Sequence, residues 1–312
     1  MNNKRLLALV LIALSLVACA RATATPAPTL MPVPTATLPP PTPTVNPAEA
    51  PPWLRDAVLY EIVPRSFYDS NGDGIGDLRR GTARLDYIQS LGANTLWLTP
   101  VFSSTDTSGY QVTDYFTLAP SLGTKDDWAD LIRQAHSRNL RVLMDLPLAY
   151  TSNEFPFFKD AYNKLKSEYG DWYQWTNAGH TAYQAYENQR NLPLLNHKSP
   201  AVQTHLLQVA LEWLKTDVDG FRVGDAAIAP HDFWKLFRRA VKNANPGAVL
   251  VGEAWENDPR KLALYFQDEF DALLDVPVYT ALTGGPDRNG AGLLNGRATA
   301  ADLDNAIAAA KS

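Results

Sequence analysis

Short apolar runs alternate with segments of helical periodicity from residue 53 onward. This alternation favours a parallel β-sheet, because consecutive parallel strands need a crossover that is usually a helix. The runs expected to form strands are 58–64, 94–100, 141–147, 220–226, 249–255 and 270–276. The segments expected to form helices are 84–92, 126–140, 202–215 and 231–244.

This order of elements predicts an α/β protein, a (β/α)8 TIM barrel of which the chain carries about six of the eight β/α units. The partial barrel is expected to span 53–312, with a small subdomain, 148–199, inserted after the third strand. A doubly wound sheet is the alternative fold, but no G-x-G-x-x-G sequence follows a predicted strand. An incomplete barrel would leave two open edges in its sheet.

Residues 1–19 contain the successive regions of a secretion signal: a basic start, a short apolar run and a cleavage motif. Lys4 and Arg5 precede an apolar run, 6–17, which is shorter than the roughly 20 residues of a membrane span. The run leads into LVAC, which resembles a bacterial lipobox and implies that Cys19 is acylated. An ordinary secretory signal with an incidental cysteine is the alternative. The lipobox predicts an extracytoplasmic lipoprotein that contacts the membrane through its lipid anchor only.

Residues 20–52 hold 11 of the 23 prolines, interleaved with Thr and Ala. This composition cannot bury a core and predicts a stiff, extended tether of up to ~100 Å, at about 3.1 Å per residue. The net charge of the whole chain is −5, without a basic stripe, so nucleic acid is not an expected partner. Cys19 is the one cysteine of the sequence, so no internal disulfide can form.

Polar or charged residues end most of the predicted strands. The carboxyl ends of the strands carry the active site in a (β/α)8 barrel. A single such residue would more often be a capping or turn carboxylate, but several at the same relative position favour a site. The residues are Asp145, Arg222, Asp225, Glu253 and Asp275.

Five segments together resemble the α-amylase superfamily, glycoside hydrolase family 13. Residues 58–102, VLYEIVPRSFYDSNGDGIGDLRRGTARLDYIQSLGANTLWLTPVF, are similar to the first two β/α units of its oligo-1,6-glucosidase-like members. The other four segments match successive motifs of the family after strands two, three, four and five. They are GYQVTDYF (109–116), DLPLAYTS (145–152), DGFRVGDA (219–226) and VGEAW (251–255).

The resemblance implies retaining hydrolysis of α-glucans or oligosaccharides. In that reaction one carboxylate is the nucleophile and a second donates a proton and then activates water. Glu253 stands at the acid/base position, and Arg222 stands where the family keeps a guanidinium against the nucleophile. The expected substrate contacts are Tyr110, whose ring would stack on the sugar, Asp145 and Gln111.

The same motifs depart from the family pattern in ways that predict impaired catalysis. Gly224 occupies the nucleophile position. The HD pair at 231–232 precedes Glu253, the wrong order for the strand-seven motif F-x-x-x-H-D, and the chain stops at Ser312 before that strand. Ala149 and Tyr150 stand where the strand-three motif has Asn and His. Gln111 and Leu194 each stand where the family has Asp, and Ile228 stands where it has a polar acceptor-side residue.

Asp225 follows the nucleophile position by one residue and is a doubtful substitute for it. Side chains alternate along a strand, so Arg222 and position 224 face one way while Asp225 faces the other. Only a local bulge, which Gly224 permits, would turn this carboxylate back towards Glu253.

A second candidate site lies in the glycine-rich segment 69–77, DSNGDGIGD. Closely spaced oxygen donors on a tight loop suit a structural Ca²⁺ ion. An Asx-turn cluster without metal is the alternative. The candidate ligands are Asp69, Asn71, Asp73, the carbonyl of Ile75, and Asp77.

Three functions remain open from the sequence. The chain is a tethered α-glucosidase or amylase, a non-catalytic relative that binds glucan or protein at the cell surface, or an incomplete part of a longer enzyme. The third possibility does not explain Gly224, Ala149 and Tyr150, which lie inside the matched motifs. The sequence therefore favours glycosidase ancestry with the character of a pseudoenzyme.

Overall fold

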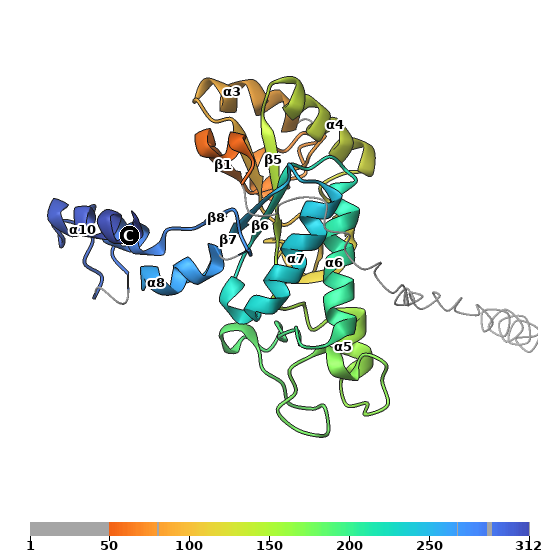
Figure 1. Ribbon diagram of the computed structural model, residues 1–312. Helices are drawn as coiled ribbons and strands as arrows, with labels where there is room; N and C mark the ends of the chain where they lie inside the picture. The colour runs from red at the N-terminus through yellow and green to blue at the C-terminus, as the bar shows by residue number, and fades with distance from the viewer. Residues whose placement is uncertain (1–49, 80, 267, 286–288, 312) are drawn as a thin grey trace, which may run out of the picture. The chain divides into compact units, whose positions relative to one another are not determined.

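The computed structural model describes residues 50–79, 81–266, 268–285 and 289–311 (Figure 1). The expected signal, its Cys19 and nearly all of the expected tether lie outside these residues, so they stay predictions. Within the described ranges, no helix is long and apolar enough to cross a membrane.

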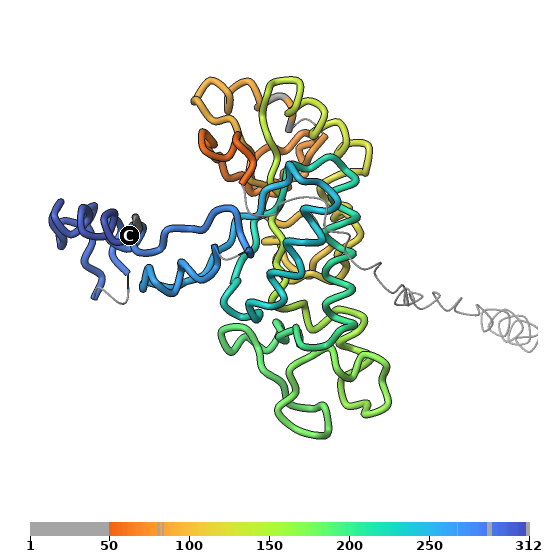
Figure 2. The backbone as a smooth tube through the Cα atoms, viewed as in Figure 1, coloured from red at the N-terminus to blue at the C-terminus, as the bar shows by residue number. Residues whose placement is uncertain are grey.

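Six parallel strands form one sheet, and they pair in chain order, β1-β2-β5-β6-β7-β8. Each lies inside a run predicted from the sequence. The sheet is the expected incomplete TIM barrel, a six-strand half-barrel (Figure 2). The strands are β1 (Leu59–Ile62), β2 (Thr95–Leu98), β5 (Arg141–Leu146), β6 (Gly220–Val223), β7 (Val249–Gly252) and β8 (Ala272–Leu273).

The longer helices each bury one face. In α4 (Lys125–Ser137) the buried side chains recur at helical spacing, and Thr124 caps the amino end. Helix α6 (Pro200–Leu214) packs against α7 (His231–Ala244). The shorter helices are α2 (Pro64–Phe67), α3 (Leu85–Ser90), α5 (Pro156–Ala161), α8 (Pro259–Leu262), α9 (Val276–Thr283) and α10 (Ala300–Lys311). The 3₁₀ segments are η1 (Pro52–Asp56), η2 (Gly81–Arg84), η3 (Gly170–Trp172), η4 (Tyr186–Asn188), η5 (Ala226–Ile228) and η6 (Ala263–Phe266).

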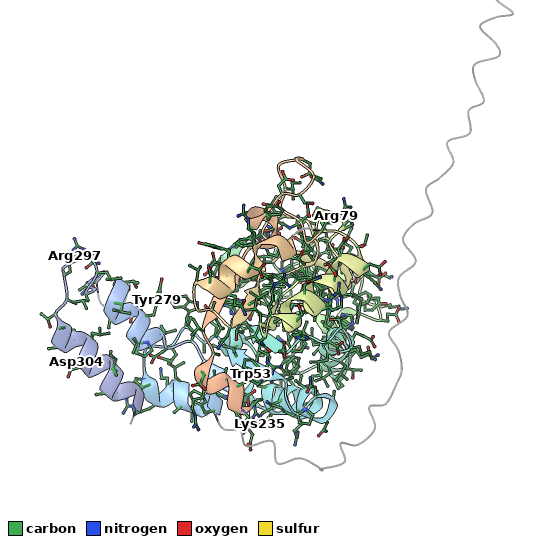
Figure 3. The ribbon with its side chains drawn as sticks, turned by 90° about the horizontal axis from the view of Figure 1, so that it is seen from above. Trp53, Arg79, Lys235, Tyr279, Arg297 and Asp304 are labelled. Carbon is green, nitrogen blue, oxygen red and sulfur yellow. The ribbon has the colours of Figure 1, made fainter. Side chains whose placement is uncertain are left out.

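The two last helices follow the last strand of the sheet. Helices α9 and α10 contact each other, and Figure 3 labels Tyr279 on the first and Asp304 on the second. Tyr279 is exposed and its ring lies 5.9 Å from that of Trp255, just beyond β7.

A small antiparallel sheet, β3 (Phe102–Ser104) with β4 (Val112–Leu118), interrupts the first half of the barrel. The sequence analysis did not predict it. The loop between its strands carries Tyr110 and Gln111, so this sheet fixes part of the candidate site.

The segment between β5 and α6 is held together mainly by aromatic packing. Phe157 stacks on Tyr169 with ring centroids 4.1 Å apart, and Trp172 and Tyr173 are buried. His205 of α6 is buried against the same rings, and this burial lowers its pKa to about 4. Trp172 and Tyr173 are therefore part of the core of this segment.

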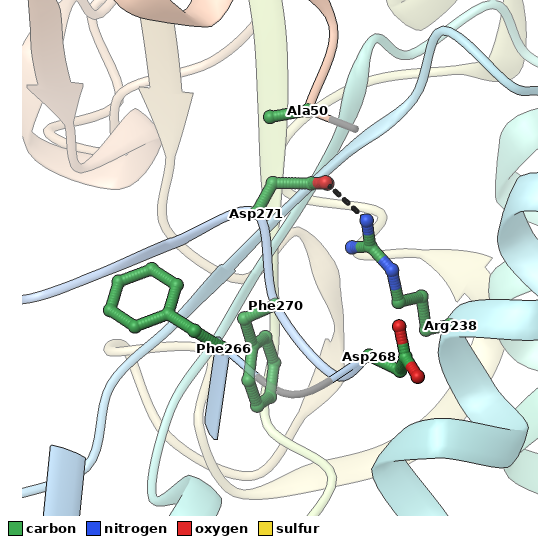
Figure 4. Close-up of a pocket in the computed structure, with 6 residues that line it drawn as sticks. All are labelled: Ala50, Arg238, Phe266, Asp268, Phe270 and Asp271. Atoms are coloured by element: carbon green, nitrogen blue, oxygen red, sulfur yellow. Dashed lines mark ion pairs between the residues drawn. The ribbon is translucent and has the colours of Figure 1, made fainter. Parts of the chain in front are cut away.

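A buried cluster of charges fastens the last strand of the sheet. Asp271, directly before β8, pairs with Arg238 and Lys242 of α7 at 2.8 Å each. Figure 4 shows the first of these ion pairs beside Phe266, Phe270 and other residues that line a pocket. All three charged side chains are at most 4% exposed, so the cluster is well shielded from water.

Candidate functional site

Three of the predicted site residues meet at the carboxyl ends of neighbouring strands. Asp145 of β5 stands opposite Arg222 of β6 in the strand register, and Glu253 follows β7 directly. Nη1 of Arg222 lies 3.0 and 3.1 Å from the two carboxylate oxygens of Asp145. Its Nη2 donates to Oε2 of Glu253. One guanidinium therefore bridges both carboxylates.

Two aromatic residues complete this bridge. The hydroxyl of Tyr110 donates to Oδ2 of Asp145 at 2.6 Å, and burial raises the pKa of Tyr110. The guanidinium carbon of Arg222 lies 5.0 Å from the ring centroid of Trp97 on β2. Asp145 has no exposed side-chain surface, and burial raises its pKa although Arg222 opposes the shift. The guanidinium of Arg222 thus compensates the charge of the Asp145 carboxylate, which has no contact with water.

The guanidinium also takes up space beside Gly224. A Cβ atom placed on Gly224 would lie 2.8 Å from Nη1 of Arg222 and 3.7 Å from Oε2 of Glu253. The first distance is too short for a real contact, so any side chain at 224 would have to displace Arg222. The position that the family motif gives to the nucleophile is therefore without a carboxylate and partly filled by a cation.

Asp225 does not follow the strand alternation that the sequence analysis assumed. Strand β6 ends at Val223, and Asp225 has left-handed backbone angles, φ 55° and ψ 36°. Its carboxylate accepts a 2.9 Å hydrogen bond from the hydroxyl of Tyr186. Burial raises the pKa of Asp225, and the field of Arg222 lowers it, so the two groups lie within electrostatic range. The alternation of side chains along β6 therefore does not extend to Asp225, because the strand ends before it.

A packed apolar cluster replaces the polar residues of the family motifs. Ala149, Tyr150 and Leu192 are buried together, and other partly buried residues pack on them. The rings of Tyr150 and Tyr186 lie 4.7 Å apart with their planes at 34°. The partly buried members are Tyr186, Leu194 and Ile228. Three motif departures that are far apart in the sequence, Tyr150, Leu194 and Ile228, thus pack together in one cluster.

Gln111 lies apart from the charged bridge. Its Oε1 accepts from the hydroxyl of Thr105 at 2.9 Å, and its backbone N–H donates to Asp106 at 3.3 Å. His231, of the misplaced HD pair, begins α7 and lies 2.9 Å from Glu269. Burial raises the pKa of Glu269, and the interaction with His231 lowers it. The structure brings neither Gln111 nor His231 to Glu253.

Two residues of the site were missed by the sequence analysis. Trp97 lies in a predicted strand on the same side as Thr95 and Thr99, and this spacing was available as a signal. Tyr186 lies in the irregular insert, where no periodicity indicates which aromatic residue reaches the site.

The oxygen donors of the 69–77 loop are held by hydrogen bonds within the loop. Asp69 accepts from the backbone N–H groups of Gly72 and Gly74 at 2.7 and 2.8 Å, and these bonds, that of Gly74 first, lower its pKa. Asp73 accepts from the N–H of Ile75, and Asp77 from Ser70. Nowhere in the described part of the chain are three or more His, Cys, Asp or Glu side chains grouped as a metal site.

The comparison with known families decides the ancestry of this site. Residues 61–291 match the model of the α-amylase catalytic domain. The chain belongs to the α-amylase family. Its relatives place it among the members of glycoside hydrolase family 13 that resemble oligo-1,6-glucosidase.

Two curated relatives and one solved structure show the extent of the likeness. Alpha-amylase 3 of Dictyoglomus thermophilum is 36% identical over 69% of this chain and 46% of its own length. A cyclomaltodextrinase of a Bacillus species is 32% identical over 76% of this chain and 48% of its own. The cyclic α-maltosyl-(1→6)-maltose hydrolase of Arthrobacter globiformis, in complex with that sugar, aligns with a TM-score of 0.73 at 28% identity, over 84% of this chain and 62% of its own. The chain thus spans about half the length of the curated relatives it matches.

Proposed function

We propose that this α-amylase homologue binds neutral α-glucan oligosaccharides at the carboxyl ends of its strands and is impaired in hydrolysing them. The observation that carries the proposal is the arrangement around Gly224. A retaining hydrolase needs two carboxyls about 5–5.5 Å apart, one on each side of the bond to be broken. Here Arg222 lies beside Gly224 where the first is expected, and it pairs with Glu253, the expected second.

The ion pair also works against the acid role of Glu253. A general acid must give a proton to the leaving group, and Oε2 of Glu253 is here engaged by the guanidinium of Arg222. Substrate binding needs neither the proton nor the nucleophile. This arrangement at the carboxyl ends of the strands therefore supports binding better than hydrolysis.

One observation favours a second candidate, hydrolysis with Asp225 as the nucleophile. Its left-handed backbone ends the strand alternation and leaves its carboxylate in electrostatic range of Arg222. Its hydrogen bond goes to Tyr186 rather than to Arg222, and we therefore prefer the binding function.

Isothermal titration of the purified protein with maltotriose tests the proposed function. We expect saturable binding, with the sugar recovered unchanged after the titration. Heat equal to that of buffer dilution would contradict the binding, and release of glucose or maltose would contradict the impairment.

We further propose that the 69–77 loop binds one structural calcium ion. The donor set, carboxylate, amide and carbonyl oxygens on one tight loop, fits the preference of calcium for hard oxygens. Binding would require Asp69, Asp73 and Asp77 to exchange their loop hydrogen bonds for the ion. The ion would have a structural role in the loop after β1 and no role in chemistry at Glu253.

Removal of calcium should lower the melting temperature if the loop is occupied. A ligand that binds only the folded state stabilises it by about 2.7 kcal/mol at a hundredfold excess over its dissociation constant. Scanning fluorimetry with and without chelator measures the shift, and Asp73→Ala should abolish it. The exposed Asp304 of α10 provides the control variant Asp304→Ala, which should keep the shift. Identical melting curves with and without chelator would rule out the site.

We also propose that the protein is a lipoprotein held by acylated Cys19 at an extracytoplasmic membrane surface, with 20–52 as a tether for the 53–312 body. Cys19→Ala should move the protein from the detergent-extracted membrane fraction to the soluble fraction, because the lipid is the only anchor proposed. Fractionation followed by immunoblotting measures this. Membrane retention of Cys19→Ala at the wild-type level would contradict the anchor.

A further inference from the structure

His205, in the second turn of α6, is enclosed by aromatic rings from three other parts of the fold. These rings come from β4, from α5 with its amino-terminal cap, and from η3, and helix α5 lies against the amino-terminal part of α6 (Figure 1). The imidazole therefore stands at the junction of the insert, the small sheet and a helix of the barrel. The rings with centroids within 6.3 Å of it are Tyr115, Phe116, Phe155, Phe157 and Trp172.

This ring cluster suits a neutral imidazole and opposes a charged one. His205 is 6% exposed, and its Nε2 atom is buried without a hydrogen-bond partner among the described residues. A neutral imidazole carries one N–H, whereas an imidazolium carries an N–H on both nitrogens. Protonation would thus place an unpaired, charged donor among aromatic rings, and burial of an unpaired charge is costly.

The neighbouring charges do not supply an acceptor for that donor. Burial lowers the pKa of His205, and the field of Asp114 on β4 opposes the shift. Both oxygens of Asp114 already accept hydrogen bonds, from the N–H of Phe116 and the hydroxyl of Thr117.

The other ionisable side chains of the packed elements and their caps do not supply one either. They are phenols whose pKa burial raises, or charges that pair at the surface or are exposed. These side chains are Tyr115, Tyr169, Lys159, Asp160, Asp171 and Glu212.

We propose that His205 is a pH-sensitive switch that holds the 148–199 insert against α6 and β4 while its ring is neutral and releases the insert when the ring is protonated. The neutral ring packs edge-on against its neighbours, with interplanar angles between 64° and 89°. The imidazolium needs water or an acceptor, and it reaches water only when the rings of α5 and η3 move away. This switch is independent of sugar binding and of Glu253.

Acid should weaken the folded protein over a defined pH range. The pKa of His205 is about 4 in the folded protein, against an ordinary value of 6.5, so the unfolded chain takes up this proton first. The stability that the neutral ring contributes is complete above about pH 6.5 and is lost as the pH falls towards 4. Between pH 7.5 and pH 5, this group alone should raise the unfolding equilibrium constant about thirtyfold.

Urea unfolding of wild type and variants at pH 7.5 and pH 5 tests the switch. The ratio of the two unfolding constants is taken within each protein, so a change in overall stability cancels. His205→Phe cannot ionise, and its ratio should be about thirtyfold smaller than that of wild type. His180→Asn is the matched control, because His180 lies in the same insert and stacks on Trp175. It should keep the wild-type ratio.

Hydrogen exchange followed by mass spectrometry tests whether the insert is the part that opens. In wild type, peptides from 150–199 should exchange faster relative to those of β2 and β5 at pH 5 than at pH 7.5. In His205→Phe these relative rates should be the same at both pH values. Comparing peptides within one sample removes the direct effect of pH on the exchange reaction.

Two results would overturn the switch. One is an equal pH dependence of unfolding in wild type and His205→Phe. The other is a difference in unfolding without faster exchange of the insert, which would mean that the buried histidine affects the whole fold and does not control the insert. If His205→Phe does not fold, His205→Gln, which is uncharged at both pH values, takes its place in the same comparison.

Discussion

Purified protein is expected to turn over maltotriose and a nitrophenyl α-glucoside about a million times more slowly than a catalytic relative. Removing the nucleophile from a set of catalytic groups that act together costs about six decades in rate. At about 1.36 kcal/mol per decade, that is about 8 kcal/mol of transition-state stabilisation. Binding the sugar equally well in the ground and transition states does not restore this lost stabilisation, because it leaves the chemical barrier unchanged.

Variants of the site give this measurement its controls. At saturating sugar, Glu253→Gln and Asp225→Asn should leave the residual turnover number unchanged, because neither group completes a retaining pair. Gly224→Asp should not restore activity by itself, since its Cβ would lie 2.8 Å from Nη1 of Arg222 and the guanidinium, which pairs with Asp145 and Glu253, would have to shift. Fast turnover that disappears in Asp225→Asn would establish Asp225 as the nucleophile and reverse our interpretation of the site.

Replacing Asp271 by alanine should destabilise the fold by about 3–5 kcal/mol, as removal of one partner from a buried ion pair does. The substitution removes the carboxylate that compensates Arg238 and Lys242, both at most 4% exposed. It also removes the acceptor for the backbone N–H of Leu250 on β7. Urea unfolding followed by circular dichroism measures the change in the free energy of unfolding.

The exposed ion pair between Asp86 and Arg138 provides the control for that experiment. The side chain of Asp86 is 75% exposed, so Asp86→Ala should change the free energy of unfolding by less than about 1 kcal/mol. Equal effects of the two substitutions would mean that the cluster at β8 is not essential to the stability of the sheet.

The six strands of the sheet were predictable because each one is a short apolar run between helical segments. Sheet β3–β4 was not, since apolar and polar residues do not alternate regularly along its seven-residue second strand. Its register also shifts twice along the three residues of β3. Tertiary pairing, not local sequence, determines this element.

The candidate site was predictable only as a set of residues at one edge of the sheet. Asp145, Arg222 and Glu253 meet there as expected, because parallel strands bring their carboxyl ends together. The position of Asp225 was not predictable by counting along the strand, since β6 ends two residues earlier. The position of Tyr186 beside Asp225 was not predictable either, because Tyr186 lies in an insert whose sequence has no periodic pattern.

Each strand of the six-strand sheet after the first pairs with the strand of that sheet that precedes it in the chain, and this order has a consequence for synthesis. A chain that leaves the ribosome amino end first completes each strand after the neighbour on which it pairs, so the sheet can grow in one direction. Residues 147–219 separate β5 from β6, and at about 5–20 residues per second their translation takes several seconds. The free edge of β5 stays without its partner for that interval. We expect it to be the point at which the nascent chain is most exposed to wrong pairing.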